Sequence, residues 1–285
     1  MRLNKNMKIL IVGLGLIGGS YASCLSNRGY EVGAITLNES DIEYALNKKI
    51  ISHGQTNVNK EYVSKFDLVI FALYPTVLLD WINEYKNYFK DDTILTDVTG
   101  VKGSIVYKIQ DLLKDTKLEF VGAHPMAGKE VYGVQNSSPT LFEKANFIIT
   151  PTDKNKEESV ELIKDLASEL GVRNISVISP EKHDEMIAFL SQLTHCIAVC
   201  LMTCNQSDNM QDYTGDSFRD LTRIAQINEY MWSELFLMNK EPLLQMMRIF
   251  RDDFDKLTGY IEADDKQAIM DMMRISTERR KLFNK

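Results

Sequence analysis

The chain has 285 residues, of which 44% are hydrophobic and 26% charged, as in soluble globular proteins, and this length suits two domains better than one. Its net charge of −7 argues against nucleic acid as the main partner, because binding to phosphates needs a basic field. No apolar run in the sequence approaches a membrane span and no apolar leader precedes the first predicted strand, so we expect a cytoplasmic protein without a membrane partner.

The first predicted strand, 8–12, runs directly into the glycine-rich turn GLGLIG and then into a helix. This order is typical of dinucleotide-binding folds. We expect Gly13 to form the turn, Gly15 to let the backbone approach a pyrophosphate, and Gly18 to let the helix pack closely on the strand. The N-terminus of the helix would then offer unpaired N–H groups to the phosphates. The predicted cofactor-binding residues of this turn are Gly13, Gly15, Leu16, Ile17 and Gly18.

The second predicted strand, 30–37, should end beside the adenosine ribose of the cofactor. An acidic residue at that point would favour NAD, whereas a nearby arginine would favour NADP. Thr36 occupies the position instead. The residues themselves therefore leave the choice between NAD and NADP open.

Strands and helices alternate from there to about residue 178. The predicted strands are 66–73, 93–97, 118–123, 146–150 and 174–178, and the predicted helices are 40–49, 77–89, 104–113 and 156–170. The near-continuous apolar run 66–73 suits a parallel strand covered on both faces, and we expect Leu73, Tyr74 and Pro75 at its end to turn over the cofactor. The alternation predicts a Rossmann-type, doubly wound parallel sheet in a dinucleotide-binding domain, 1–178.

Beyond this point nearly every segment is predicted to be helical. The periodic stretches are 181–205, 217–239, 242–259 and 264–283. We expect a helical domain, 179–285, that covers the cofactor cleft, binds the substrate and pairs with a second copy in a homodimer. Its methionine-rich apolar faces suit either such an interface or an ordinary helical core.

The chain has four histidines, and one of them follows a predicted strand directly. His124 lies where open α/β sheets place their ligands, and imidazole is well suited to accept a hydroxyl proton near neutral pH. We predict a catalytic role for His124; the alternative is a turn histidine that caps backbone groups. His195 shares a helix face with Ser191, and a substrate site or a buried core position are both open for His195 and for His183. His53 lies in a polar Ser-His-Gly loop and is assigned no role.

Arg219 and Arg223 are one helical turn apart. Arginine pairs well with carboxylates, although a surface ion-pair pattern is the default interpretation of this spacing. The apolar neighbours of Arg223 favour a position facing the cleft. Three cysteines, Cys196, Cys200 and Cys204, repeat along one helix, which spreads their thiols rather than gathering them around an ion, so we predict no metal site.

Five motifs in this order resemble the prephenate/arogenate dehydrogenase family of tyrosine biosynthesis. They are GLGLIGGS at 13–20, TDVTGVKG at 96–103, HPMAGKEVYG at 124–133, HDEMIAFLSQLTH at 183–195 and FRDLTRIA at 218–225. The resemblance implies oxidative decarboxylation of prephenate to 4-hydroxyphenylpyruvate, with hydride transfer to NAD(P)⁺. It implies that NAD is the cofactor, by family frequency, with NADP not excluded.

The resemblance also implies roles for individual residues. His124 would take the proton of the C4 hydroxyl, and Arg223 would pair with a substrate carboxylate. His195 and Ser191 match positions in the substrate pocket. Gln192 lies where some members have histidine, and we expect it to bind the substrate as well. Glu130 matches a gating acid, and Arg219 would add positive field for a dianionic substrate. Asp97 lies at the end of the predicted strand 93–97, near the expected position of the nicotinamide, and we expect it to contact the cofactor.

The sequence departs from the family where a serine often follows that aspartate. Thr99 and Gly100 occupy this turn, and we expect the Thr99 hydroxyl to substitute for the serine. The sequence leaves open whether the substrate is prephenate or arogenate, and whether tyrosine inhibits the protein. The other hypotheses are a two-domain dehydrogenase of a β-hydroxyacid or an imine, and a non-catalytic module that senses NAD(P).

Overall fold

The computed structural model describes residues 2–129, 131–205 and 207–283 and divides the chain into two compact units. The first unit is Met1–Asn239 and the second is Lys240–Lys285. The boundary that we place between residues 178 and 179 is a different division, and it stays a prediction.

The first unit is built on an eight-stranded sheet with the strand order β3-β2-β1-β4-β5-β6-β7-β8. The strands are β1 Lys8–Val12, β2 Glu31–Ile35, β3 His53–Gln55, β4 Leu68–Phe71, β5 Ile94–Asp97, β6 Glu119–Pro125, β7 Asn146–Thr150 and β8 Asn174–Val177. The first six run parallel in the order that dinucleotide-binding folds share. The predicted Rossmann-type sheet is therefore confirmed.

The exception is β7, which pairs antiparallel with β6, whereas β8 runs parallel to β7. The expectation of a wholly parallel sheet is wrong at this strand. A parallel return needs a crossover, usually a helix. In the described part of the connection between β6 and β7, the helical structure is limited to the 3₁₀ turn Val134–Asn136.

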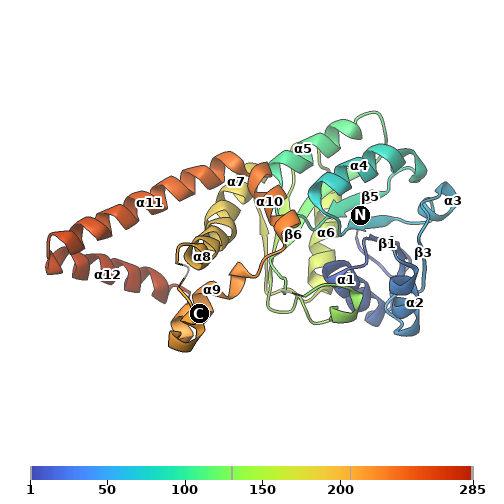
Figure 1. Cartoon of the computed structure of the whole chain (residues 1–285). Coiled ribbons are helices and arrows are strands. Elements are labelled where there is room, and N and C mark those ends of the chain that lie inside the picture. The colour runs from blue at the N-terminus through green and yellow to red at the C-terminus, as the bar shows by residue number, and fades with distance from the viewer. Residues whose placement is uncertain (1, 130, 206, 284–285) are drawn as a thin grey trace. The chain divides into compact units, whose positions relative to one another are not determined.

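Helices cover both faces of the sheet, because successive side chains of each buried strand point to opposite sides. Ile9 and Ile11 of β1 join the core under one group of helices, and Leu10 and Val12 join the core under the other. The first group is α1 Leu16–Asn27, α2 Glu39–Asn47 and α6 Glu157–Glu169, and the second is α4 Pro75–Tyr85 and α5 Gly103–Leu112 (Figure 1).

Two short elements are missing from the prediction. The segment around His53 is not a loop but strand β3, which pairs with β2 through Gly33 opposite His53. A four-residue helix, α3 Lys60–Val63, follows it. The sequence of β3, HGQ, carries no apolar run, so its strand conformation comes from pairing with β2 and from the contact of His53 Nδ1 with the Tyr62 hydroxyl at 2.9 Å.

The rest of the first unit is helical. A continuous helix is formed by α7 Pro180–Ile187, a π-helical segment Ala188–Leu193, and α8 Thr194–Thr203. It is followed by α9 Asp216–Thr222, the 3₁₀ turn Arg223–Ala225, and α10 Glu229–Met238. The predicted single helix 217–239 is wrong, because Asn228 caps α10 by accepting a hydrogen bond from the Met231 backbone N–H at 2.9 Å.

Helix Pro180–Thr203 is long and apolar enough to cross a membrane, judged by length and composition alone. The expectation that no apolar stretch approaches a membrane span does not hold for this helix. However, His183, Asp184 and Gln192 in this helix are buried and hydrogen-bonded to other parts of the first unit. These contacts indicate a core helix of the unit.

The second unit is a helical hairpin of α11 Lys240–Glu262 and α12 Lys266–Lys281. The Asp265 side chain accepts a hydrogen bond from the Ala268 backbone N–H and begins α12. Both helices carry large apolar side chains that are exposed, among them Phe250, Phe254, Ile261, Met270, Met273 and Ile275.

Candidate active site

The glycine turn between β1 and α1 has the geometry that a cofactor phosphate needs. Gly13 has φ +94°, a conformation that side chains other than glycine rarely adopt. A Cβ atom there would lie 2.4 Å from the Ala72 carbonyl oxygen, and one at Gly18 would lie 1.9 Å from the Gly13 carbonyl oxygen. A Cβ atom at Gly15, where α1 begins, would meet no atom within 4 Å. The turn therefore requires glycine at its base and leaves its outer side open.

Neighbouring loops surround this turn. The Gly13 N–H donates to the Ile35 carbonyl oxygen at 2.8 Å, which places Thr36 next to the turn at the end of β2. Leu73 lies against Gly13, and Tyr74 and Pro75 begin α4 as its N-cap and first residue. Each of these predicted cofactor contacts thus lies beside the turn or at the start of α4.

The turn after β5 is held together by a buried ion pair. Asp97 and Lys102 are both fully buried, and the Lys102 Nζ atom lies 2.5 Å from Asp97 Oδ2. Asp97 Oδ1 accepts the Ala123 N–H at 3.0 Å, and Asp97 Oδ2 accepts the Thr99 N–H at 2.9 Å. Burial lowers the pKa of Lys102, and Asp97 opposes this shift. The hydrogen bonds of Asp97 therefore hold the turn and join β5 to β6.

Thr99 has its hydroxyl directed into this same turn. The Oγ1 atom hydrogen-bonds to Asp97 Oδ2 and to the Val101 carbonyl oxygen. Gly100, the next residue, lies close to the predicted base: a Cβ atom there would be 3.9 Å from His124 Cε1. The catalytic role of Thr99 stays a prediction, and the structure gives its hydroxyl contacts within the loop.

His124 lies near the end of β6 and contacts a second imidazole. Its Nδ1 atom is 2.9 Å from His183 Nε2, and His183 Nδ1 is 2.8 Å from Asp184 Oδ1. His183 is completely buried, whereas His124 is partly buried. Burial, His183 and the Lys102 ammonium lower the pKa of His124 well below that of ordinary histidine. His124 is consequently neutral near pH 7, as a proton acceptor must be.

The π-helical segment carries the predicted pocket residues Ser191 and Gln192, with His195 one turn beyond. Single π turns occur often at functional sites. His195 Nδ1 donates to the Ser191 carbonyl oxygen at 2.9 Å, and its ring stacks on Trp232 of α10 with centroids 3.7 Å apart. The structure therefore brings Ser191 and His195 together and adds Trp232, which the sequence did not indicate.

Gln192 is placed differently from Ser191 and His195. It is almost completely buried and donates to the Leu235 carbonyl oxygen at 3.0 Å. Its Oε1 atom accepts the Asn239 amide at 2.7 Å, and the same amide lies 2.9 Å from the Asp184 carbonyl oxygen. Gln192 thus links the π-helical segment to α10, and its proposed contact with substrate stays a prediction.

The two arginines lie on exposed positions. Arg219 pairs with Asp216 one turn earlier at 2.7 Å, which is the surface ion pair that its spacing suggests. Arg223 begins the 3₁₀ turn that packs against α8, the helix of His195. Glu130, the expected gating acid, lies outside the described residues.

Sequence reasoning missed the part of the site behind His124. Lys102 and Asp184 received no role, and His183 was left open. A buried charged side chain cannot be distinguished from an exposed one by residue type, since its partners come from distant segments. The available signal was their place inside the motifs TDVTGVKG and HDEMIAFLSQLTH.

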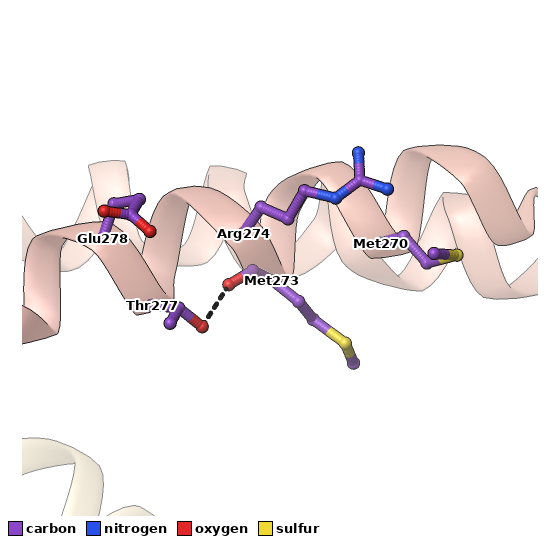
Figure 2. A pocket seen from close by; sticks show the side chains of 5 residues that line it. All are labelled: Met270, Met273, Arg274, Thr277 and Glu278. Atoms are coloured by element: carbon purple, nitrogen blue, oxygen red, sulfur yellow. Dashed lines mark hydrogen bonds between the residues drawn. The ribbon is translucent and has the colours of Figure 1, made fainter.

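The glycine turn, the Leu73 loop, Asp97 and His124 all lie at one edge of the sheet. The carboxyl ends of the parallel strands β1, β4, β5 and β6 carry the glycine turn, the Leu73 loop, Asp97 and His124, respectively. Open α/β sheets bind ligands at this edge. By contrast, the groove in Figure 2 lies along α12, and its residues Met270, Met273, Arg274, Thr277 and Glu278 include none of those predicted for the site.

Comparisons with known proteins agree with this arrangement. A family model described as "Prephenate dehydrogenase, nucleotide-binding domain" matches residues 21–176, and one described as "Prephenate dehydrogenase, dimerization domain" matches residues 179–275. The prephenate dehydrogenase of Lactococcus lactis is 31% identical over 270 residues, which are 92% of this chain and 73% of the relative. The cyclohexadienyl dehydrogenase of Zymomonas mobilis is 29% identical over 282 residues, covering 95% and 94% of the two chains.

A solved structure is similar over almost its whole length. It is the prephenate dehydrogenase of Aquifex aeolicus in complex with hydroxyphenyl propionate and NAD⁺, with a TM-score of 0.89, 28% identity and coverage of 97% of this chain and 98% of the other. The resemblance carried by the five motifs is thereby confirmed, and the chain belongs to the prephenate dehydrogenase family.

Proposed function

We propose that this protein oxidises the ring hydroxyl of prephenate with NAD⁺ and releases the ring carboxylate as CO₂, forming 4-hydroxyphenylpyruvate. The observation that carries this proposal is the position of His124 at the edge of the sheet that also bears the glycine turn, where burial lowers its pKa and favours the neutral ring. Relatives named prephenate dehydrogenase align over more than nine tenths of the chain, which supports this substrate over arogenate.

The cofactor fits the glycine turn. The clash-free space at Gly15 would admit the pyrophosphate, and the first backbone N–H groups of α1 would donate to it. Thr36 would lie at the ribose, and the Leu73 loop at the start of α4 would cover the other side. NAD⁺ in the related Aquifex structure supports this cofactor. NADP⁺ is the alternative that the assay below tests.

Different residues of the chain would carry out different parts of the reaction. The nicotinamide, when bound, supplies the acceptor for the hydride from C4. The Nε2 atom of His124 takes the proton of the C4 hydroxyl. Loss of the ring carboxylate as CO₂ completes the aromatic ring. We assign the substrate carboxylates to Arg223, with Arg219 as a second cation, and the pocket wall to Ser191, His195 and Trp232.

The test is the formation of reduced nicotinamide by the purified protein, measured by absorbance with prephenate or arogenate and with NAD⁺ or NADP⁺. We expect the highest turnover with prephenate and NAD⁺. Highest turnover with arogenate would correct the substrate. Absence of turnover in all four combinations, with NAD⁺ bound in a calorimetric titration, would refute the proposed reaction.

The base is tested by His124→Asn. We expect kcat to fall roughly 100- to 10,000-fold, since general base catalysis contributes about that much, while the Kd for NAD⁺ stays unchanged. The control is His53→Asn in β3, which changes a histidine remote from the proposed site. Full turnover by the His124→Asn protein would remove this residue from the mechanism.

We also propose that two copies pair through the helical region, and that the protein is cytoplasmic. The match of residues 179–275 to a dimerization domain supports pairing, and the exposed apolar side chains of α11 and α12 offer a surface for it. The groove in Figure 2, with Met270 and Met273 exposed on one helix, is the part of that surface on α12. Light scattering should give twice the mass of the chain; a monomeric mass would refute the pairing.

A further inference from the structure

A chain of hydrogen bonds runs from His124 away from the edge of the sheet. It passes through the buried His183 ring to the Asp184 carboxylate, with heavy-atom distances of 2.9 Å and 2.8 Å. His124 belongs to β6, whereas His183 and Asp184 are neighbours on α7. The two imidazole rings meet edge to face, with centroids 5.1 Å apart.

The carboxylate at the end of this chain is fixed by the backbone. Asp184 Oδ1 accepts the Lys102 N–H and Asp184 Oδ2 accepts the Gly103 N–H, both at 2.8 Å. These N–H groups lie at the N-terminus of α5, where helices leave backbone donors unpaired and favour negative charge. Asp184 therefore faces donors on both oxygens, and it acts toward His183 as an acceptor.

Burial favours the neutral form of both rings. Burial lowers the pKa of His183, although the hydrogen bond to Asp184 opposes the shift. The pKa of His124 is lowered further by burial, by His183 and by Lys102. Lys102 and Asp97 face these rings from the loop after β5, and Asp184 faces them from α7.

A neutral imidazole carries one N–H, so the acceptor at one end orders the whole chain. His183 must donate from Nδ1 to Asp184, which leaves its Nε2 as an acceptor. His124 must then donate from Nδ1 to His183 Nε2. The remaining nitrogen of His124, Nε2, is left with its lone pair.

We propose that Asp184 and His183 are positioning residues that hold His124 in the Nδ1–H tautomer, with Nε2 ready to take the substrate proton. This proposal rests on the proposed role of His124 as the base. After His124 takes the proton, its Nδ1–H still donates to His183 Nε2 and His183 Nδ1–H still donates to Asp184 Oδ1, so the ring keeps its orientation. In catalytic triads and at metal sites, too, an acceptor bonded to one ring nitrogen of a histidine fixes the tautomer and the orientation of the ring.

The first test replaces the acceptor. In Asp184→Asn the amide can donate to His183 Nδ1, which would reverse both imidazoles and place the hydrogen of His124 on Nε2. We expect kcat with prephenate to fall roughly 100- to 10,000-fold, with the KM for NAD⁺ unchanged within about threefold, as for a wrong histidine tautomer. Glu185→Gln is the matched control, since Glu185 is the next residue and pairs with Lys182 on the exposed side of α7. We expect it to keep the activity of the unmodified protein.

The second test observes the tautomer directly. The ¹⁵N NMR spectrum of the full chain labelled at its four histidines should show His124 protonated at Nδ1 and not at Nε2, with the signals assigned by comparison with His124→Asn. In Asp184→Asn the hydrogen of His124 should instead be on Nε2. This spectrum decides the question in the unmodified protein even if Asp184→Asn does not fold.

A hydrogen on Nε2 of His124 in the unmodified protein would overturn the proposal. So would an Asp184→Asn protein that is folded and has unchanged kcat. Failure of the underlying base role is a separate result, because it requires that His124→Asn keep full turnover.

Discussion

At the scale of single residues, Gly15 and Gly18 differ in what surrounds them, although both belong to the same motif. Alanine at Gly18 would bring a methyl group 1.9 Å from a backbone oxygen, whereas alanine at Gly15 would meet no protein atom within 4 Å. We expect Gly18→Ala to lower the free energy of unfolding by about 1–3 kcal/mol, as overpacking does. Urea denaturation measures this change.

Gly15→Ala serves as the comparison. It should leave the free energy of unfolding within about 0.5 kcal/mol, because the methyl group enters open space. It should nevertheless raise the KM for NAD⁺, since that space is the one proposed for the pyrophosphate. Equal losses of stability in the two variants would contradict the distinction between a packing glycine and a ligand-facing glycine.

Single residues could be predicted from the sequence where a local pattern demands them. Gly13 and Gly18 follow from a strand, a turn and a helix in succession, and His124 follows from its place after a strand. The burial of Asp184 and Lys102 could not be predicted, because it depends on the contact between α7 and the start of α5. These elements are distant in the sequence: the bond from the Gly103 N–H to Asp184 joins residues that are 81 positions apart.

At the scale of elements, the π-helical segment 188–193 is held to α10 by the buried side chain of Gln192. Gln192→Ala would remove the acceptor of the Asn239 amide and the donor to Leu235. We expect a loss of about 1–3 kcal/mol in the free energy of unfolding, the usual result of leaving a buried polar group unsatisfied. Gln226→Ala, at an exposed position, should change it by less than about 0.5 kcal/mol. Thermal denaturation of both proteins gives the comparison, and a similar midpoint for the two would argue against this role of Gln192.

Elements could be predicted where they bury apolar side chains. The strands β1 and β4 are fully or almost fully buried, and their sequences are apolar runs. The strand β3 could not be predicted, because its three residues are half-buried and owe their conformation to a neighbour. The π-helical segment was also missed, since the apolar periodicity of 181–205 is the same on either side of it.

At the scale of the whole molecule, the completely buried His183 and the partly buried His124 make stability depend on pH. The folded pKa values of His124 and His183 are lowered, so unfolding takes up protons below about pH 6.5, the ordinary value for histidine. The stabilisation is therefore complete above about pH 6.5 and is lost as the pH falls toward the folded pKa values.

Urea denaturation between about pH 7.5 and pH 5.5 measures this loss. We expect the free energy of unfolding to fall over this interval, and to fall less steeply in His124→Asn, which has one of the two groups removed. Identical slopes for both proteins would show that His124 is not the source.

The overall architecture could be predicted because the evidence for it is spread along the chain. Five motifs in order indicated the family, and the alternation of strands and helices indicated the sheet. The direction of β7 could not be inferred from its own residues, since an apolar run fits either orientation. It depended on the connection from β6, where a crossover helix was neither predicted nor found among the described residues.

The bonds from the Lys102 and Gly103 backbone N–H groups to Asp184 also have a consequence for dynamics. They join the start of α5 to α7 through two amides whose hydrogens can exchange with solvent only when this contact opens. Hydrogen–deuterium exchange at these two positions would therefore measure the free energy of separating α7 from the start of α5. Slower exchange with substrate and cofactor present would show how strongly ligand binding holds the imidazole pair in place.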